Sequence, residues 1–325
     1  MAVVLGTGSI GMQHLRTFQS LRKIKILAAP IRSERLPALN GAGFITCKDL
    51  SEAAKKGATL AIIATDTSRH IGDLRDALKA GLHVLVEKPI SPTVAGTSSM
   101  RRIVRRARRQ VFVGCVLRFS ESLHQFRAWL PRIGSIHSVR IECQSYLPDW
   151  RPHRPYQNSY SARRDEGGVL RDLIHEIDYA GWLYGWPGAL QARLNNLGRL
   201  GIESEEVADL SWETTSGTLV SINLDYLTRP SVRKMRALGE RGILEWNGIT
   251  QRVRFEPAKG KPREFVSSQT REELFLAQAK AVVQACRGKV DERLASLDDG
   301  IKAIAICDAV RRASANRCEE LVKYP

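Results

Sequence analysis

The order of apolar runs predicts an α/β protein with an N-terminal doubly wound parallel sheet and a second α/β domain built on a mainly antiparallel open sheet. Up to about residue 118, strand patterns alternate with amphipathic helices, which is typical of a parallel sheet. Beyond it, strand patterns follow one another across short polar turns, which favours antiparallel pairing. A chain of 325 residues is long enough for two domains. We therefore expect domains at 1–118 and 119–325.

The composition argues against membrane, metal and disulfide-based classes. No apolar run reaches the roughly 18 residues needed to cross a bilayer. The first residues lack the basic start and cleavage site of a secretory signal, so we expect a cytoplasmic protein. The six cysteines are scattered without any C-x-x-C pair, which predicts neither a metal site nor a disulfide scaffold.

The net charge of +16 is concentrated most densely at 101–109, where six arginines surround a narrow apolar stripe. The simplest interpretation is a solvated helix face. A nucleic-acid surface is the alternative, but no aromatic residues interleave to stack bases and no DNA-binding spacing is present. We therefore do not expect a nucleic-acid partner. A positive field would also attract an anionic cofactor or substrate.

A glycine-rich turn follows the first apolar run. Gly6, Gly8 and Gly11 form G-x-G-x-x-G, and an amphipathic helix begins there. The first glycine permits the tight turn, the second lets the backbone approach a pyrophosphate, and the third allows close helix–strand packing. A strand before and a helix after are the context that this motif requires. We predict a Rossmann-type dinucleotide site whose phosphates meet the helix N-terminus at Gly6, Gly8, Ser9, Ile10 and Gly11.

The end of the second strand indicates which dinucleotide binds. An acid at this place would hold the ribose 2′-hydroxyl of NAD. The chain instead offers Arg32, Ser33 and Arg35, with Glu34 as the only acid. Guanidinium groups fork onto phosphate oxygens, so we expect Arg32 and Ser33 to bind the 2′-phosphate of NADP. NADP is favoured and NAD remains possible.

Polar residues follow the next strands, at the edge where parallel sheets bind ligands. We expect the cofactor to pass Thr65, Asp66, Thr67, His70, Glu87 and Lys88. Pro89 fixes the backbone after the lysine. A further strand is expected in "RQVFVGCVLRFS" (109–120), ending at Arg118, which would lie near the substrate.

Together, G-x-G-x-x-G, "IIATDTSRH" and "AGLHVLVEKP" at these intervals resemble the Gfo/Idh/MocA family of oxidoreductases, which includes glucose-fructose oxidoreductase and inositol dehydrogenase. The resemblance implies that Lys88 reaches both substrate and nicotinamide, and that the bond before Pro89 forms a cis turn. It implies hydride transfer between nicotinamide C4 and a hydroxyl-bearing carbon of a sugar. It also implies a closing helix, within 296–317, packed near the first domain.

A second motif lies in "EGGVLRDLIHEIDYAGWLYG". Asp172, His175 and Asp178 recur every three residues, so one continuous helix would hold them near one face. Histidine exchanges protons near neutrality, and a carboxylate can orient its ring. The family motif G-G-x-x-x-D-x-G-x-H-x-x-D has one more residue between its aspartate and histidine, which leaves the contact of Asp172 open. The predicted catalytic residues are Lys88, His175 and Asp172, and either Lys88 or His175 could be the main acid/base.

The segment at 146–168 mixes aromatic rings, prolines and arginines, a combination that suits a sugar. Its arginines would also suit a phosphate or carboxylate. "PDWRP" followed by "SYSA" resembles a subset of the family linked with surface-sugar synthesis, including sialic-acid-like sugars. The predicted substrate-binding residues are Arg118, Trp150, Arg154, Tyr156, Tyr160, Asp172 and His175.

The predicted function is an NAD(P)-dependent oxidoreductase acting on a sugar or a nucleotide-, amino- or sialic-acid-like derivative. We expect a homo-oligomer, a dimer or tetramer, formed through the open sheet. The alternative is a non-catalytic NAD(P)-binding regulator. Lys88, Asp172 and His175 argue against it, because a sensor needs no proton relay.

Overall fold

The computed structural model describes all residues from 1 to 325, which divide into two units. One unit contains Met1–Phe119 and Thr270–Ile301, and the other contains Ser120–Gln269 and Lys302–Pro325. The division differs from the expected 1–118 and 119–325, because a segment from late in the chain returns to the N-terminal sheet. The helix α10 (Leu297–Asn316) begins in the first unit and continues in the second.

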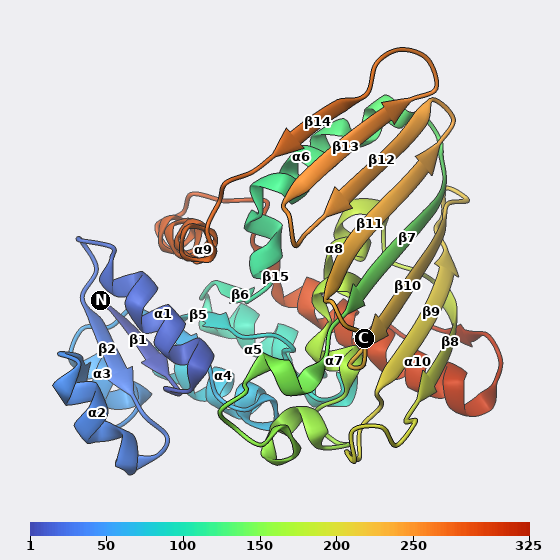
Figure 1. Cartoon of the computed structure of the whole chain (residues 1–325). Coiled ribbons are helices and arrows are strands. Elements are labelled where there is room, and N and C mark those ends of the chain that lie inside the picture. The colour runs from blue at the N-terminus through green and yellow to red at the C-terminus, as the bar shows by residue number, and fades with distance from the viewer. The chain divides into compact units, whose positions relative to one another are not determined.

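The first unit is built on a seven-stranded sheet in the order β15-β6-β5-β4-β1-β2-β3 (Figure 1). Every pair is parallel except β15 with β6. The strands are β1 (Ala2–Leu5), β2 (Ile26–Ala29), β3 (Ile45–Thr46), β4 (Leu60–Ile63), β5 (His83–Val86), β6 (Val111–Val113) and β15 (Ala295–Ser296). The expected parallel sheet is confirmed, but the strand expected to reach Arg118 ends at Val113.

Helices cover this sheet and complete its core. They are α1 (Ser9–Gln19), α2 (Leu36–Gly41), α3 (Leu50–Lys55), α4 (His70–Lys79), α5 (Met100–Ala107) and α9 (Arg271–Ala285), with 3-10 turns η1 (Ser33–Arg35), η2 (Thr67–Arg69), η3 (Val94–Thr97) and η4 (Val116–Phe119). All residues of β1 and β4 are buried, as both faces of the sheet are covered. Leu15 and Phe18 of α1 share one apolar cluster with Val282 of α9.

The second unit is built on a nine-stranded sheet in the order β14-β13-β12-β11-β7-β10-β9-β8-β16. Only β7 and β10 pair in parallel, so the expected, mainly antiparallel sheet is confirmed. The strands are β7 (Ile136–Gln144), β8 (Ala189–Asn195), β9 (Val207–Glu213), β10 (Leu219–Asp225), β11 (Val232–Gly239), β12 (Gly242–Asn247), β13 (Arg252–Pro257), β14 (Arg263–Val266) and β16 (Glu320–Leu321).

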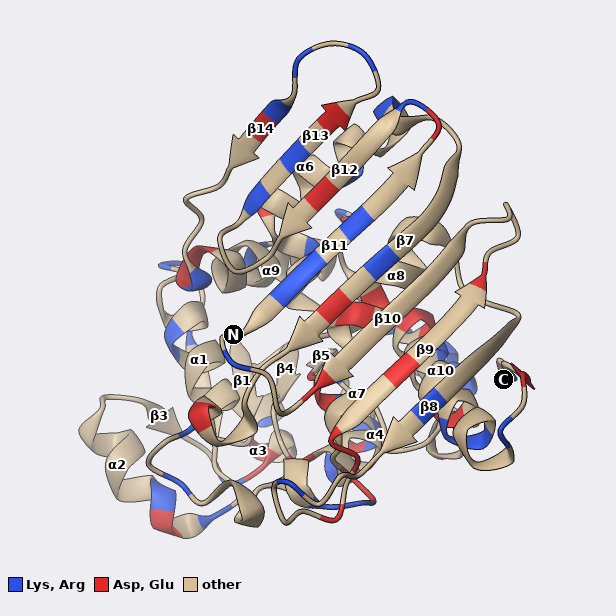
Figure 2. Ribbon diagram, turned by 45° about the vertical axis from the view of Figure 1, so that its right-hand side comes forward, with Lys and Arg blue, Asp and Glu red and all other residues tan.

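One face of this sheet is apolar and the other is charged. Ala208, Leu210 and Trp212 of β9 are buried, whereas the alternate residues are exposed. The buried face packs against α6 (Glu121–Trp129), α7 (Val169–Asp172) and α8 (His175–Tyr184). Figure 2 shows acidic and basic positions along β7 and β13 and basic positions along β11. The 3-10 turns are η5 (Leu130–Ile133), η6 (Leu147–Trp150), η7 (Tyr156–Asn158) and η8 (Tyr160–Ala162). No helix of the chain has the length and apolar character to span a membrane.

Candidate active site

Two glycines of the β1–α1 turn are required by packing. Gly6 has φ +90°, and a Cβ there would lie 2.5 Å from the carbonyl oxygen of Ala64. A Cβ on Gly11 would lie 1.9 Å from the carbonyl oxygen of Gly6. A side chain at position 6 would therefore push the turn away from the segment after β4, and one at position 11 would push α1 away from the turn.

The third glycine of the motif lies in open space. Gly8 is the N-cap of α1, its φ of −69° suits any residue, and a Cβ there would meet no atom within 4 Å. No side chain caps the helix, so its first N–H groups lack an intrahelical or side-chain partner. An uncapped N-terminus beside open space fits the pyrophosphate of a dinucleotide. Ser9 is exposed and Ile10 half-buried at the same place.

The loop after β2 folds back over this turn. Arg35 in η1 donates a hydrogen bond of 2.7 Å to the carbonyl oxygen of Thr7. Arg32 and Ser33 are exposed immediately before it. The predicted 2′-phosphate ligands thus lie on a loop whose position is tied to the glycine-rich turn. Arg35 was not among the predicted ligands, although the sequence R-S-E-R at 32–35 places a second arginine in this loop.

The residues after β4 form a local hydrogen-bond network. The Thr65 hydroxyl donates a hydrogen bond of 2.7 Å to the carboxylate of Asp73 in α4. Asp66 is exposed and Thr67 is buried. The buried His70 ring lies 3.0 Å from the carbonyl oxygen of Thr65 and 2.8 Å from that of Pro89. Burial lowers the pKa of His70, and a neutral ring has one N–H, so it donates to one of the two carbonyls at a time. His70 thus connects the ends of β4 and β5.

The E-K-P segment at the end of β5 is held by a buried carboxylate. Glu87 lies 2.6 Å from Nε2 of His14 in α1 and accepts the Lys88 backbone N–H at 3.2 Å. Burial opposes ionisation of Glu87, but the hydrogen bond and charge of His14 outweigh it and lower its pKa. A Cβ on Gly114 would lie 3.0 Å from this carboxylate, so glycine leaves room for it. Lys88 is half-buried, and the Lys88–Pro89 bond is cis.

Arg118 has a different place from the one predicted. It lies in η4, its side chain is 2% exposed, and its guanidinium is 3.4 Å from Oδ2 of Asp299. Asp299 also accepts hydrogen bonds from the Ser296 N–H and hydroxyl. The buried ion pair does not favour a substrate contact by Arg118, which stays a prediction.

The helix predicted to carry Asp172 and His175 together is interrupted. α7 ends at Asp172, Leu173 has non-helical angles (φ −95°, ψ 30°), and α8 begins at His175. The expectation of one continuous helical face is therefore wrong. The gap that is one residue shorter than in the family motif coincides with a turn between two helices. Asp178 lies within α8 and is buried.

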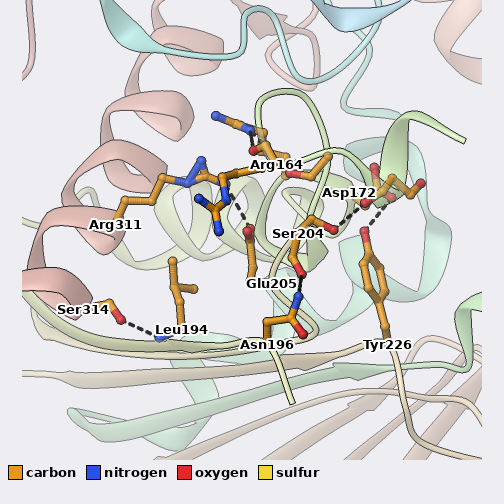
Figure 3. Close-up of polar contacts among 12 residues, drawn as sticks. Arg164, Asp172, Leu194, Asn196, Ser204, Glu205, Tyr226, Arg311 and Ser314 are labelled. Atoms are coloured by element: carbon orange, nitrogen blue, oxygen red, sulfur yellow. Dashed lines mark hydrogen bonds and ion pairs between the residues drawn. The ribbon is translucent and has the colours of Figure 1, made fainter. Parts of the chain in front are cut away.

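The double glycine before α7 is explained by close packing. A Cβ on Gly167 would lie 2.2 Å from the carbonyl oxygen of Tyr160. Gly168 has φ +94°, and a Cβ there would lie 2.2 Å from the carboxylate of Glu205. Glu205 is also paired with Arg311 of α10 at 3.0 Å (Figure 3). These contacts fix the chain immediately before Asp172.

Asp172 is held by two tyrosines. Tyr226, directly after β10 and fully buried, donates a hydrogen bond of 2.7 Å to Oδ2 of Asp172 (Figure 3). The Asp172 carboxylate and burial both raise the pKa of Tyr160, which also hydrogen-bonds to Asp172. Burial and Asp172 likewise raise the pKa of Tyr226, so both hydroxyls stay protonated donors. Sequence reasoning missed Tyr226, since nothing local links it to a residue 54 positions away.

The start of α8 is anchored to the sheet by an ion pair. Glu176 is 0% exposed and lies 2.8 Å from Nε of Arg233 in β11. His175 is the preceding residue, so this pair fixes the helix turn that carries it. The pair was not predicted, because it joins elements 57 residues apart.

Three of the predicted sugar-binding residues line one pocket. It has a volume of about 170 Å³. Its lining residues are Leu147, Trp150, Arg151, Arg154, Pro155, Tyr156, Asn158, Ser159 and Ser161. The Trp150 ring meets the Tyr226 ring edge-on at 5.4 Å, so the pocket adjoins the tyrosines around Asp172.

Comparison with known proteins identifies the family. Residues 1–115 match the family model described as "Oxidoreductase family, NAD-binding Rossmann fold", and residues 131–245 match the GFO/IDH/MocA C-terminal domain. The chain belongs to the GFO/IDH/MocA family. The resemblance drawn from its motifs is thereby confirmed.

Two curated relatives illustrate the range of the family. The rhizopine catabolism protein MocA of Rhizobium meliloti is 30% identical over 189 residues, which cover 56% of each chain. The chain thus spans about half the length of this relative. Myo-inositol dehydrogenase Hyg17 of Streptomyces leeuwenhoekii is 25% identical over 262 residues, or 76% of each chain.

Two solved structures share the fold over nearly the whole chain. Levoglucosan dehydrogenase in complex with NADH and levoglucosan has a TM-score of 0.88 at 18% identity, covering 99% of this chain and 98% of that one. The WlbA dehydrogenase from Bordetella pertussis in complex with NADH and UDP-GlcNAcA has a TM-score of 0.82 at 20% identity, covering 100% and 99%. At these identities the likeness establishes the fold.

Proposed function

We propose that this protein is an NAD(P)-dependent oxidoreductase that transfers hydride between nicotinamide C4 and a hydroxyl-bearing carbon of a sugar or sugar derivative. The observation that carries the proposal lies in the first unit. The carboxyl ends of its parallel strands carry an uncapped helix N-terminus at Gly8 and a lysine held between the buried Glu87 and Pro89. The family and the neighbouring dehydrogenase structures support it.

Lys88 is proposed to act on the reacting hydroxyl. The bound cofactor supplies a nicotinamide ring able to accept or donate hydride. The ammonium group of Lys88 hydrogen-bonds the oxygen that is a hydroxyl in one direction and a carbonyl in the other. Glu87 fixes the backbone of Lys88, so the lysine starts from a defined position.

His175 is proposed to exchange the hydroxyl proton, with Lys88 as the alternative group. Glu176 and Arg233 anchor the helix turn that carries His175. Asp172 is assigned a positioning role, since it is buried and held by tyrosine hydroxyls. A contact of Asp172 or Tyr160 with substrate remains a prediction.

We propose that NADP is preferred to NAD. Support comes from Arg32 and Ser33 on a loop tied to the glycine-rich turn through Arg35. An Arg32→Ala variant should weaken NADPH binding about tenfold and leave NADH binding unchanged, as measured by calorimetry. Equal loss for both cofactors would reject this role.

Self-association is proposed for the charged face of the open sheet. Its exposed pairs, such as Arg236 with Glu245 at 3.1 Å, give the face both signs of charge. Such a face can meet a second copy of itself. Light scattering over a range of salt concentrations would test for a dimer or tetramer.

Hydride transfer from a panel of sugars, followed by nicotinamide absorbance with NAD and NADP, tests the proposed activity. Lys88→Ala and His175→Ala should each lower kcat about 10²- to 10⁴-fold, and cofactor affinity should stay unchanged. Lys79→Ala is the matched control, since Lys79 is exposed on α4 and pairs only with Asp76 at 3.3 Å. Cofactor binding without hydride transfer from any sugar would favour the regulator.

A further inference from the structure

The pocket of the second unit carries two arginines and no acid. Arg151 and Arg154 are both among its lining residues, and none of the others is an aspartate or glutamate. We propose that this pocket binds an oxyanion, a carboxylate or a phosphate, carried by the sugar substrate. The inference rests on the proposed function for the sugar, whereas the anion follows from the pocket itself.

The charge of these arginines is not neutralised within the chain. Neither Arg151 nor Arg154 has a side-chain ion pair, and both are exposed. Neighbouring arginines are different, because Arg163 lies 3.4 Å from Glu166 and Arg229 lies 3.7 Å from Asp149. Two guanidinium groups at one concave site offer the forked donors that carboxylates and phosphates accept.

The rest of the wall suits a sugar ring. Trp150 Nε1 donates a hydrogen bond of 2.9 Å to the Ser145 hydroxyl, and the Tyr156 hydroxyl donates one of 3.0 Å to the carbonyl oxygen of Leu200. These bonds fix two aromatic rings at the pocket. Asn158 and Ser161 add polar groups able to meet sugar hydroxyls. The volume of about 170 Å³ far exceeds the roughly 10–15 Å³ that one water needs by the same measure, so the pocket has room for a small ligand such as a monosaccharide.

The pocket also adjoins the group around Asp172. Trp150 packs on Tyr226, which donates to Asp172. Arg151 is close enough to Tyr160 to oppose the rise in its pKa that Asp172 and burial cause. The anionic end of the substrate would therefore meet the arginines, with the Asp172 carboxylate screened by its tyrosine donors.

Binding of acidic sugars and their neutral parents tests the proposal. The probes are D-glucose, D-glucuronate and D-glucose 6-phosphate, with N-acetylglucosamine, its 6-phosphate and N-acetylneuraminate as a second set. We expect at least one acidic member to bind tenfold or more tightly than its neutral parent. Arg151→Met and Arg154→Met should remove that difference, and cofactor affinity should not change.

Arg164→Met is the matched control, since Arg164 belongs to the same loop but does not line the pocket. Its effect on acidic sugars should be less than twofold, and an equal loss would overturn the proposal by showing a general charge effect. The proposal also fails if no acidic probe binds, or if neutral parents bind equally well. Comparing the affinities of the sugar carboxylates with those of the sugar phosphates shows which anion is preferred.

The test separates this inference from the proposed function. Hydride transfer from neutral sugars alone would support the enzyme and overturn the anion site. Arginine-dependent binding of an acidic sugar without hydride transfer would support the anion site and count against the enzyme.

Discussion

At the scale of single residues, the site depends on buried polar groups whose partners are far away in the chain. Glu87 and His14 are 73 residues apart, yet their side chains meet at 2.6 Å. The sequence motif predicted Glu87 as a cofactor contact, whereas the structure also gives it a local task, fixing α1 to the end of β5. Such a pair cannot be predicted from local spacing, because it exists only once the sheet has formed.

Glu87→Gln should destabilise the protein by about 1–3 kcal/mol, since it removes a charge-assisted hydrogen bond from a buried site. Urea unfolding would measure the loss. Glu52→Gln is the control, because Glu52 pairs with Lys56 on an exposed helix face and should change stability far less. Similar losses in both variants would show that the His14–Glu87 pair has no special weight.

His70 should make stability depend on pH. Burial lowers its folded pKa below the usual value of about 6.5, so the unfolded chain binds the proton first. The contribution of the neutral ring is complete above that value and is lost as pH falls through the folded pKa. His70→Gln should therefore flatten the decline in urea stability between neutral and mildly acidic pH. His137→Gln, at an exposed position near the start of β7, should leave it unchanged.

At the scale of elements, the glycine-rich turn was predicted well because its motif is local. The motif assigned one task to each glycine. In the structure, packing requires glycine at positions 6 and 11, whereas at Gly8 a Cβ would meet no neighbouring atom. Gly11→Ala should prevent stable folding, since its Cβ would lie 1.9 Å from a backbone oxygen. Circular dichroism during thermal unfolding would test this, and a variant of wild-type stability would contradict it.

The break between α7 and α8 was not predictable from periodicity, because a spacing of three fits both a helix and a turn. What holds Asp172 is the tertiary contact with Tyr226. Asp172→Asn and Tyr226→Phe should each lower kcat about tenfold. The double variant should lower kcat by less than the product of the two single effects, because both substitutions disrupt the same hydrogen bond. Tyr184→Phe is the control, since the hydroxyl of this half-buried tyrosine donates a hydrogen bond to the Met235 sulfur, at 3.4 Å, and not to a site residue. Additive losses would mean that the two residues act separately.

At the scale of the whole molecule, the order and type of the two sheets followed from the alternation of apolar runs. The division of the chain did not, because α9 returns to the first unit. Ala279, Val282 and Ala285 of α9 belong to the same core as Leu15 and Phe18. The capping box at Thr270 and Glu273 marks where this helix begins, but no sequence signal says which sheet it joins.

A fragment ending at Phe119 should therefore remain unfolded or aggregate, because it lacks the α9 part of its core. Linking residues 270–301 to it should restore a cooperative unfolding transition. Circular dichroism of both fragments would measure this. A stable 1–119 fragment would show that α9 is dispensable for the first unit.

The most direct test of the account is a calorimetric titration with NADPH and NADH. Gly8→Ala should fold normally, since its Cβ meets no atom within 4 Å, yet bind the cofactor at least tenfold more weakly, because the methyl group occupies the pyrophosphate site. Gly72→Ala, an equally open glycine in α4, should bind like the wild type. Equal affinity in all three proteins would contradict the proposed site. Failure of the wild type to bind either cofactor, with none released on denaturation, would contradict the enzyme itself.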